Sequence, residues 1–180
     1  MKSILVTSLA VLSTVIVCSR GIAQTNDLQG QLSSKDFKFV KAAVEGGKME
    51  VTLGQIASQN AQDPAVREFG AKMVQDHQAA NQELIQVITQ KGATVTGTPG
   101  WLDERTISHL QGLKGTEFDK AYMKDMVSDH RDDIKEFQKE ADNGDDPDVK
   151  NFASKTLATL QEHLRMALDT QAKLSSSASK

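Results

Sequence analysis

A five-residue pattern ending in Asp-His occurs twice in the sequence. It reads MVQDH at Met73–His77 and MVSDH at Met126–His130, and a third histidine, His163, follows nearer the C-terminus. Imidazole is the commonest metal ligand among protein side chains, and a neighbouring carboxylate can orient the ring or join it as a ligand. The repeat therefore indicates either a metal site built from facing helices or a packing motif used twice.

Each of these histidines lies on an apolar face of an expected helix, with apolar residues three or four positions away. An unsatisfied polar ring on such a face costs roughly 1–3 kcal/mol. A metal held between helices would satisfy it, and so would hydrogen bonds to Glu50, Asp76 or Asp129. Glu50 is the carboxylate that lies beside the apolar stripe of the first expected helix. The candidate ligand set is Glu50, His77, His130 and His163.

Sulfur ligands are a second candidate, because three methionines lie one helical turn from a histidine. The pairs are Met73 with His77, Met126 with His130 and Met166 with His163. Thioether and imidazole together suit copper(I) better than iron or manganese, although methionine is also an ordinary core residue. The metal therefore stays open among zinc, copper and iron. The candidate soft ligands or outer partners are Met73, Met126, Met166, Asp76 and Asp129.

Four long helices are needed to position these side chains, and the sequence contains their start signals. Asp63-Pro64 and Asp146-Pro147 each supply an N-cap followed by proline at the first helical position. Ser33 with Asp36, and Thr116 with Asp119, match capping boxes. The expected helices run from Ser33 or Ser34 to Asn60, from Asp63 to Lys91, from Thr116 to Asn143, and from Asp146 to about residue 173.

Two of the connections are short, so the helices should form two antiparallel hairpins. The link between the hairpins, residues 92–115, is long enough to cross the bundle and contains a short helical stretch from Trp101 to about Gly112. We expect an all-α, antiparallel four-helix bundle, ferritin-like, with this short helix between helices two and three. Residues 24–32 and 174–180 are expected to be flexible, with the folded domain at 33–173.

The first 23 residues are typical of a signal peptide. Lys2 precedes an apolar run too short to span a membrane, and Gly21 and Ala23 suit a cleavage site after Ala23. The alternative is a lipoprotein with Cys18 as the modified residue. Cleavage would remove the only cysteine and leave 19 basic and 24 acidic residues. The expected location is outside the cytoplasm, in a bacterial periplasm, without an integral membrane segment after cleavage.

The remaining composition argues against several functions. A mildly acidic chain without a basic stripe does not suit nucleic acid. The sequence has no glycine-rich phosphate loop and no Ser/His/Asp pattern. Oxidase- or peroxidase-like chemistry would need a redox metal with an open position, which no pattern indicates, so the sequence leans against an enzyme. Protein partner and oligomeric state are not indicated.

Four sequence blocks carry a family resemblance. They read FVKAAVEGGKMEVTLGQIA, DPAVREFGAKMVQDHQAAN, GTEFDKAYMKDMVSDH and FASKTLATLQEHL. Together they resemble DUF4142, an exported bacterial family of unknown function placed among ferritin-like bundles, from about Phe37 to Asp169. The resemblance implies a four-helix fold and brings no established activity. Di-iron ferritin-like proteins carry glutamate three residues before a ligand histidine, but this chain has Val74, Val127 and Leu160 there.

Two functions follow from these observations. The first is an exported ferritin-like bundle that binds one transition metal at mid-bundle. The alternative is a non-catalytic structural or envelope-stress-associated module whose histidines are satisfied in the core. Replacing His77 with leucine separates them, because the first predicts lost metal and the second predicts changed stability.

Overall fold

The computed structural model describes residues 27–96 and 101–177, so the predicted signal peptide lies outside the described residues. The fold is all-α, as predicted. Five helices occur in the order α1 (Ser34–Asn60), α2 (Pro64–Thr89), α3 (Trp101–Gly112), α4 (Gly115–Asn143) and α5 (Pro147–Ser177). No helix in these two ranges is long and apolar enough to cross a membrane.

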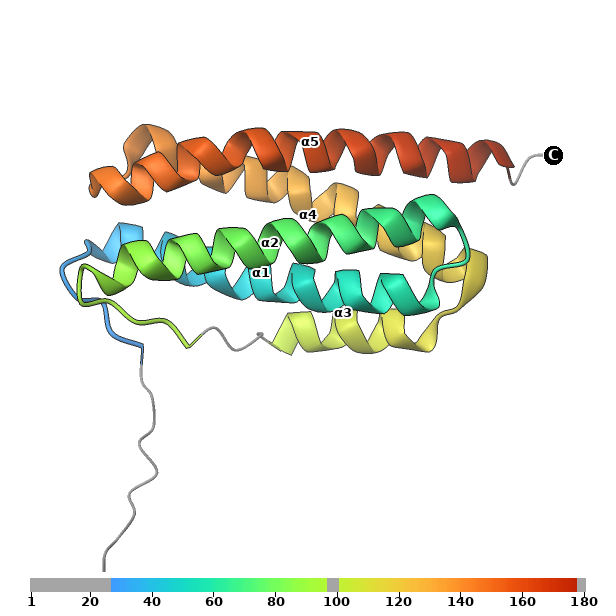
Figure 1. The fold of residues 1–180 in the computed structure, drawn as a ribbon, viewed down its shortest axis with the longest axis horizontal. Coiled ribbons are helices and arrows are strands. Elements are labelled where there is room, and N and C mark those ends of the chain that lie inside the picture. Colours follow the sequence, from blue (N-terminus) through green and yellow to red (C-terminus); the bar gives the residue numbers. More distant parts are fainter. Residues whose placement is uncertain (1–26, 97–100, 178–180) are drawn as a thin grey trace, which may run out of the picture.

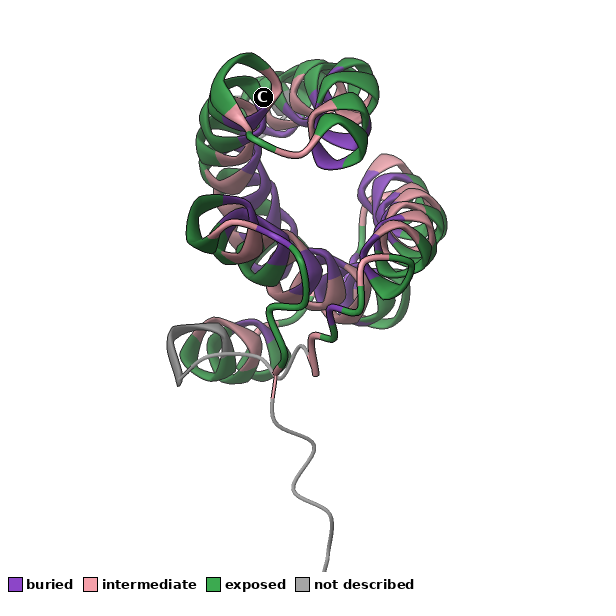
Figure 2. Ribbon diagram, turned by 90° about the vertical axis from the view of Figure 1, so that its left-hand side faces the viewer, coloured by how far each residue is buried: buried purple, intermediate pink, exposed green. Residues whose placement is uncertain are grey.

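The four long helices form a bundle of two antiparallel hairpins (Figure 1). α1 packs along α2, and α4 packs along α5, while the hairpins meet through α2 with α5 and α1 with α4. The short helix α3 lies outside the bundle against α1 and α4 and carries the chain back along it, as the predicted crossover requires. Seen end-on, the buried residues of the four long helices face the common centre (Figure 2).

The two Asp-Pro starts are confirmed. Asp63 caps α2 by accepting a hydrogen bond from Ala65 N, and Asp146 caps α5 by accepting from the backbone nitrogens of Asp148 and Val149. Each start fixes where the following helix begins, and hence the height of its histidine in the bundle.

The predicted capping boxes are only partly correct. Ser33 does cap α1 through Asp36 N, but α4 begins at Gly115 after the N-cap Lys114, not at Thr116. Both acidic residues of the boxes are buried and turn to the opposite hairpin, where they accept from backbone nitrogens of its loop. Asp36 accepts from Asp145 N and Asp146 N at 2.9 and 2.8 Å. Asp119 accepts from Gln62 N and Asp63 N at 3.0 and 2.9 Å.

Replacing Asp119 with alanine should lower the free energy of unfolding by about 2–4 kcal/mol, because two backbone donors lose the buried carboxylate that accepts from them. Chemical denaturation would measure this change. The control is Glu117→Ala, an exposed carboxylate in the same turn, for which we expect a change within about 0.5 kcal/mol. Equal effects of the two substitutions would show that Asp119 does not hold the hairpins together.

α1 and α2 approach closely at two glycines. A Cβ atom placed on Gly54 would lie 2.5 Å from the carbonyl oxygen of Gly70, and one on Gly70 would lie 2.7 Å from Cβ of Ala57. Glycine is required here because two backbones occupy the space that a side chain would take. This contact holds α2 against α1 about two helical turns before His77.

Packed residues also occur on both sides of the predicted domain of residues 33–173. Leu28 pairs with Thr94 in an isolated antiparallel bridge, and Leu32 is buried in the core. α5 continues through Ser177, with Leu174 also buried.

Candidate metal centre

Three imidazole rings meet inside the bundle, one each from α2, α4 and α5. One ring nitrogen of each of His77, His130 and His163 lies within 4.8 Å of the others. All three side chains are buried, and the ring centroids are 5.3 to 5.8 Å apart. The structure therefore brings the three candidate histidines together.

The orientation of His130 is fixed by its own helix. Its Nδ1 lies 2.9 Å from the backbone carbonyl oxygen of Met126, one turn earlier. A carbonyl oxygen can only accept a hydrogen bond, so Nδ1 carries the proton and donates it. In the neutral ring this leaves the lone pair on Nε2, which faces the other histidines.

The orientation of His163 is fixed from the neighbouring helix α2. Its Nε2 lies 2.8 Å from Oδ2 of Asp76, and the same oxygen lies 3.0 Å from Nζ of Lys72. Partial burial raises the pKa of Asp76, but the hydrogen bonds from His163 and Lys72 outweigh it and hold that pKa below its usual value. The carboxylate is therefore charged and accepts from Nε2–H, which leaves the lone pair of His163 on Nδ1.

These two assignments bring two lone pairs face to face. Nε2 of His130 and Nδ1 of His163 are 3.3 Å apart. A proton between them would require a charged ring, but burial, with the nearby His163, lowers the pKa of His130 to about 4. Burial also lowers the pKa of His163 despite its bond to Asp76. At neutral pH the pair therefore presents two acceptors and no donor to the same point.

His77 is the third ring of the group. Its Nε2 is buried and has no hydrogen-bond partner among the described residues. Burial, followed by the proximity of His130 and His163, lowers the pKa of His77 to about 3. All three rings are therefore neutral at physiological pH, which is the protonation state in which imidazole binds a metal.

The structure does not bring Glu50 into this group. Its Oε1 lies 3.8 Å from Nδ1 of His130, the nitrogen that points away from the other two rings. The two predicted outer partners differ in their contacts. Asp76 forms a hydrogen bond with His163, whereas Asp129 lines a separate cavity together with other carboxylates of α4. Met73 and Met126 are fully buried core residues, and Met166 packs partly buried against the same core.

Sequence reasoning missed two groups that orient the rings. Lys72 lies four residues before Asp76, a spacing that would have indicated a helical ion pair. The carbonyl oxygen of Met126 has no such signal, because every residue carries a backbone carbonyl. The fourth histidine, His109, is exposed on α3.

Comparison with known proteins agrees with this architecture. Residues 22–170 match the family described as "Domain of unknown function (DUF4142)". The chain belongs to the DUF4142 family. No curated protein matches it.

Solved structures similar to this DUF4142 chain belong to another family. The "putative secreted protein DUF305" from Streptomyces coelicolor is 15% identical, with a TM-score of 0.69 over 78% of this chain and 92% of that one. A DUF305 fragment from Deinococcus radiodurans is 12% identical, with a TM-score of 0.70 over 79% of this chain and 98% of that one. At these identities the likeness shows a shared helical-bundle fold.

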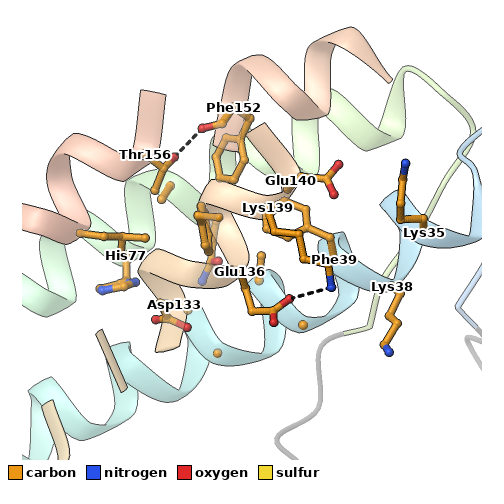
Figure 3. A pocket seen from close by; sticks show the side chains of 18 of the residues that line it. Lys35, Lys38, Phe39, His77, Asp133, Glu136, Lys139, Glu140, Phe152 and Thr156 are labelled. Atoms are coloured by element: carbon orange, nitrogen blue, oxygen red, sulfur yellow. Dashed lines mark hydrogen bonds and ion pairs between the residues drawn. The ribbon is translucent and has the colours of Figure 1, made fainter. Parts of the chain in front are cut away.

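An apolar cavity of about 700 Å³ in this DUF4142 bundle reaches His77, one of the three buried histidines. It lies mainly between α1 and α4, with Phe39, Phe137 and Phe152 among its walls. Figure 3 shows His77 at one end of the cavity and Lys35 at the other. A ligand in this cavity would therefore reach the edge of the His77 ring.

Asp133 lines the same cavity and makes the stability of the DUF4142 bundle depend on pH. Burial, with the charges of Asp129 and Asp132, raises the pKa of Asp133 to about 7 from an ordinary value of 3.8. The unfolded chain loses this proton near pH 4, whereas the folded chain keeps it until about pH 7. The folded state is therefore progressively destabilised as pH rises through this window.

Replacing Asp133 with asparagine should remove this titration. Relative to the wild type, the metal-free variant should be no more stable at about pH 4 and about 2–4 kcal/mol more stable above about pH 7. Denaturation at several pH values would measure the difference, with the exposed Asp142→Asn on α4 as control. A constant difference across the range would contradict the raised pKa.

Proposed function

We propose that this DUF4142 protein binds one transition-metal ion through His77, His130 and His163. The observation that carries the proposal is the facing pair of lone pairs on His130 and His163, 3.3 Å apart. Two nitrogens bound to one tetrahedral metal at about 2.0–2.1 Å lie about 3.3 Å apart. A cation between these nitrogens would replace a repulsive contact with two bonds.

The outer contacts support the same proposal. Metal-binding histidines characteristically donate their second N–H to a carboxylate or a backbone carbonyl, which fixes the tautomer. His163 donates to Asp76 and His130 donates to the carbonyl of Met126. Both partners lie on the far side of the ring from the point where the three histidines meet.

The donor set favours zinc or copper over iron. Three neutral imidazoles suit zinc and copper, whereas non-haem iron sites typically add a carboxylate ligand. Glu50, the one carboxylate proposed as a ligand from the sequence, faces the outer nitrogen of His130. Three protein ligands leave a fourth position of a tetrahedral ion for water or another small ligand.

We place this function outside the cytoplasm, in the mature chain that follows a cleavage after Ala23. The apolar run and the small residues of positions 1–23 support export. The name of the Streptomyces coelicolor neighbour also includes the word "secreted". In this proposal residues 33–173 form the metal-binding domain.

Cobalt(II) titration of the metal-free mature protein tests the proposal. Cobalt in a four-coordinate site absorbs visible light much more strongly than the hexaaqua ion, so the spectrum reports both stoichiometry and geometry. We expect the band to saturate at one cobalt per chain and to disappear when zinc is added. A spectrum that stays that of free cobalt would overturn the proposed site.

The Asp76→Asn variant should weaken metal affinity by about 10–100-fold, because an amide orients His163 less strongly and stabilises its bound form less. A competition titration against a chelator would measure the dissociation constant. Asp169→Asn, an exposed change on α5, should leave affinity unchanged. Equal affinity of both variants would mean that Asp76 does not support the site.

A further inference from the structure

A second cavity, of about 360 Å³, opens between α1, α3 and α4. Its polar lining is acidic: among the described residues that line it there are five carboxylates and no lysine, arginine or histidine. Four carboxylates come from two turns of α4 and one comes from α1. They are Asp125, Asp129, Asp132, Asp133 and Glu50. We call this space the acidic cavity.

Glu50 connects the acidic cavity to the histidines. Its side chain is 3% exposed, and its Oε2 has no hydrogen-bond partner within the described part of the chain. Its other oxygen lies 3.8 Å from the ring of His130. A carboxyl oxygen buried this deeply without a partner is costly unless a ligand compensates it, so the cavity has an unsatisfied oxygen ligand at its inner end.

The acidic cavity adjoins the apolar cavity that reaches His77. Gly46 and Asp133 line both spaces. A Cβ atom on Gly46 would meet no atom within 4 Å, so the helix leaves open room at this junction. Glycine inside a helix costs about 1 kcal/mol relative to alanine. Its absent side chain leaves open space where the acidic cavity and the cavity that reaches His77 adjoin.

The carboxylates are arranged to attract a cation but not to hold it. In the part of the chain that the structure describes, the three histidines are the group whose ligand atoms all approach within 4.8 Å, and the carboxylates form no such group. Several like charges lining a partly enclosed space nevertheless raise the local concentration of cations and speed their association.

We propose that the acidic cavity is the route by which a divalent metal cation reaches His77, His130 and His163. The inference rests on the metal-binding function proposed above. Asp125, Asp129 and Asp132 gather the cation from solvent at the outer part of the cavity. Asp133 and Glu50 then offer it oxygen ligands on its way past Gly46 to the three ring nitrogens.

Stopped-flow uptake of cobalt(II) by the metal-free mature protein tests this route, with the visible band of bound cobalt as the signal. The test variant carries Asp125→Asn, Asp132→Asn and Asp133→Asn. The control carries Asp142→Asn, Asp148→Asn and Asp169→Asn, which change the net charge equally at exposed positions outside the cavity. Circular dichroism establishes that both variants are folded.

We expect the test variant to take up cobalt at least tenfold more slowly than the control at low ionic strength. The difference should shrink in about 0.5 M salt, where charges are screened over a few ångströms. Both variants should still reach one cobalt per chain. Gly46→Leu, which fills the junction without changing charge, should slow uptake in low and high salt alike.

The two proposals fail in different ways. Equal uptake rates for the test and control variants, with one cobalt bound by each, would overturn the route and leave the histidine site intact. Absence of the bound-cobalt band in the wild type would overturn the site and the route together. A test variant that folds but never reaches one cobalt per chain would show that the aspartates hold the metal themselves, which also overturns the route.

Discussion

A chain in which alanine replaces His163 should hold no zinc under conditions where the wild-type chain holds one ion. His163 supplies one of three ring nitrogens and, through Nδ1, half of the 3.3 Å pair with His130. Its removal leaves two imidazoles, and Glu50 lies on the wrong side of His130 to replace the third. We expect affinity to fall by at least 1,000-fold, which corresponds to the loss of about 4 kcal/mol of binding free energy.

Metal analysis after dialysis against a weak chelator would measure this loss, together with the chelator competition that gives the dissociation constant. The matched control is His109→Ala, because His109 is exposed on α3 and lies outside the three-histidine group. Loss of metal in the control, or retention of one ion per chain in His163→Ala, would place the metal elsewhere on the protein.

Much of this fold follows from local sequence signals. Asp63-Pro64 and Asp146-Pro147 determine the start of α2 and α5 whatever surrounds them, because an N-cap side chain and a proline act within one turn. The apolar stripes predict which face of each helix is buried. The three histidines lie on those stripes, so their burial was predictable, whereas their convergence also depends on how far each helix is rotated about its own axis.

The failures arise where two hairpins compete for the same side chain. Asp119 matches a local capping box, but its carboxylate instead accepts hydrogen bonds from Gln62 N and Asp63 N of the other hairpin. A sequence pattern describes the donors within one turn and carries no information on donors more than fifty residues away. The same tertiary preference explains why Asp36 turns to the loop before α5.

Glu50 illustrates a second limit. The sequence places it on the buried face of α1, which is correct, since it is 3% exposed. Successive helical residues differ by about 100° in direction, so burial alone does not determine which nitrogen of His130 a carboxylate faces. Rotation of α1 about its axis sets that choice, and packing between α1 and α2 at Gly54 and Gly70 sets the rotation.

The acidic cavity was not predicted, although its carboxylates follow a regular spacing in the sequence. Asp125, Asp129 and Asp132 with Asp133 recur at spacings of three and four residues on one face of α4. Such a run usually indicates a solvated helix face. The structure shows instead that these carboxylates line a cavity whose other walls are α1 and α3, with Glu50 at its inner end.

Replacing His77 with leucine should abolish metal binding without destabilising the metal-free protein. The Nε2 atom of His77 is buried and makes no hydrogen bond to any described residue. An apolar side chain of similar size removes this unsatisfied group at little or no cost. We therefore expect the free energy of unfolding at about pH 8 to stay within about 1 kcal/mol of the wild type or to rise.

Thermal unfolding with and without zinc measures both effects. At free zinc about 100 times the dissociation constant, the wild type should gain about 2.7 kcal/mol, or roughly 5–10 °C in Tm for a domain of this size. The His77→Leu variant should gain nothing. A variant that is less stable by several kcal/mol without metal would instead indicate that His77 is a hydrogen-bonded structural residue of the core.

The pH dependence of the stability of His77→Leu gives a second, independent test. His77 has a pKa of about 3 in the folded chain against 6.5 ordinarily, so the unfolded state takes up the proton first as pH falls. The contribution of the neutral His77 ring to the free energy of unfolding is therefore complete above about pH 6.5, and it is lost progressively as the pH falls toward 3. Leucine does not titrate, so the stability of His77→Leu relative to the metal-free wild type should increase by about 2 kcal/mol between pH 8 and pH 5. If that difference does not change with pH, the ring is not held neutral by burial, and the argument that it is ready to bind a metal fails with it.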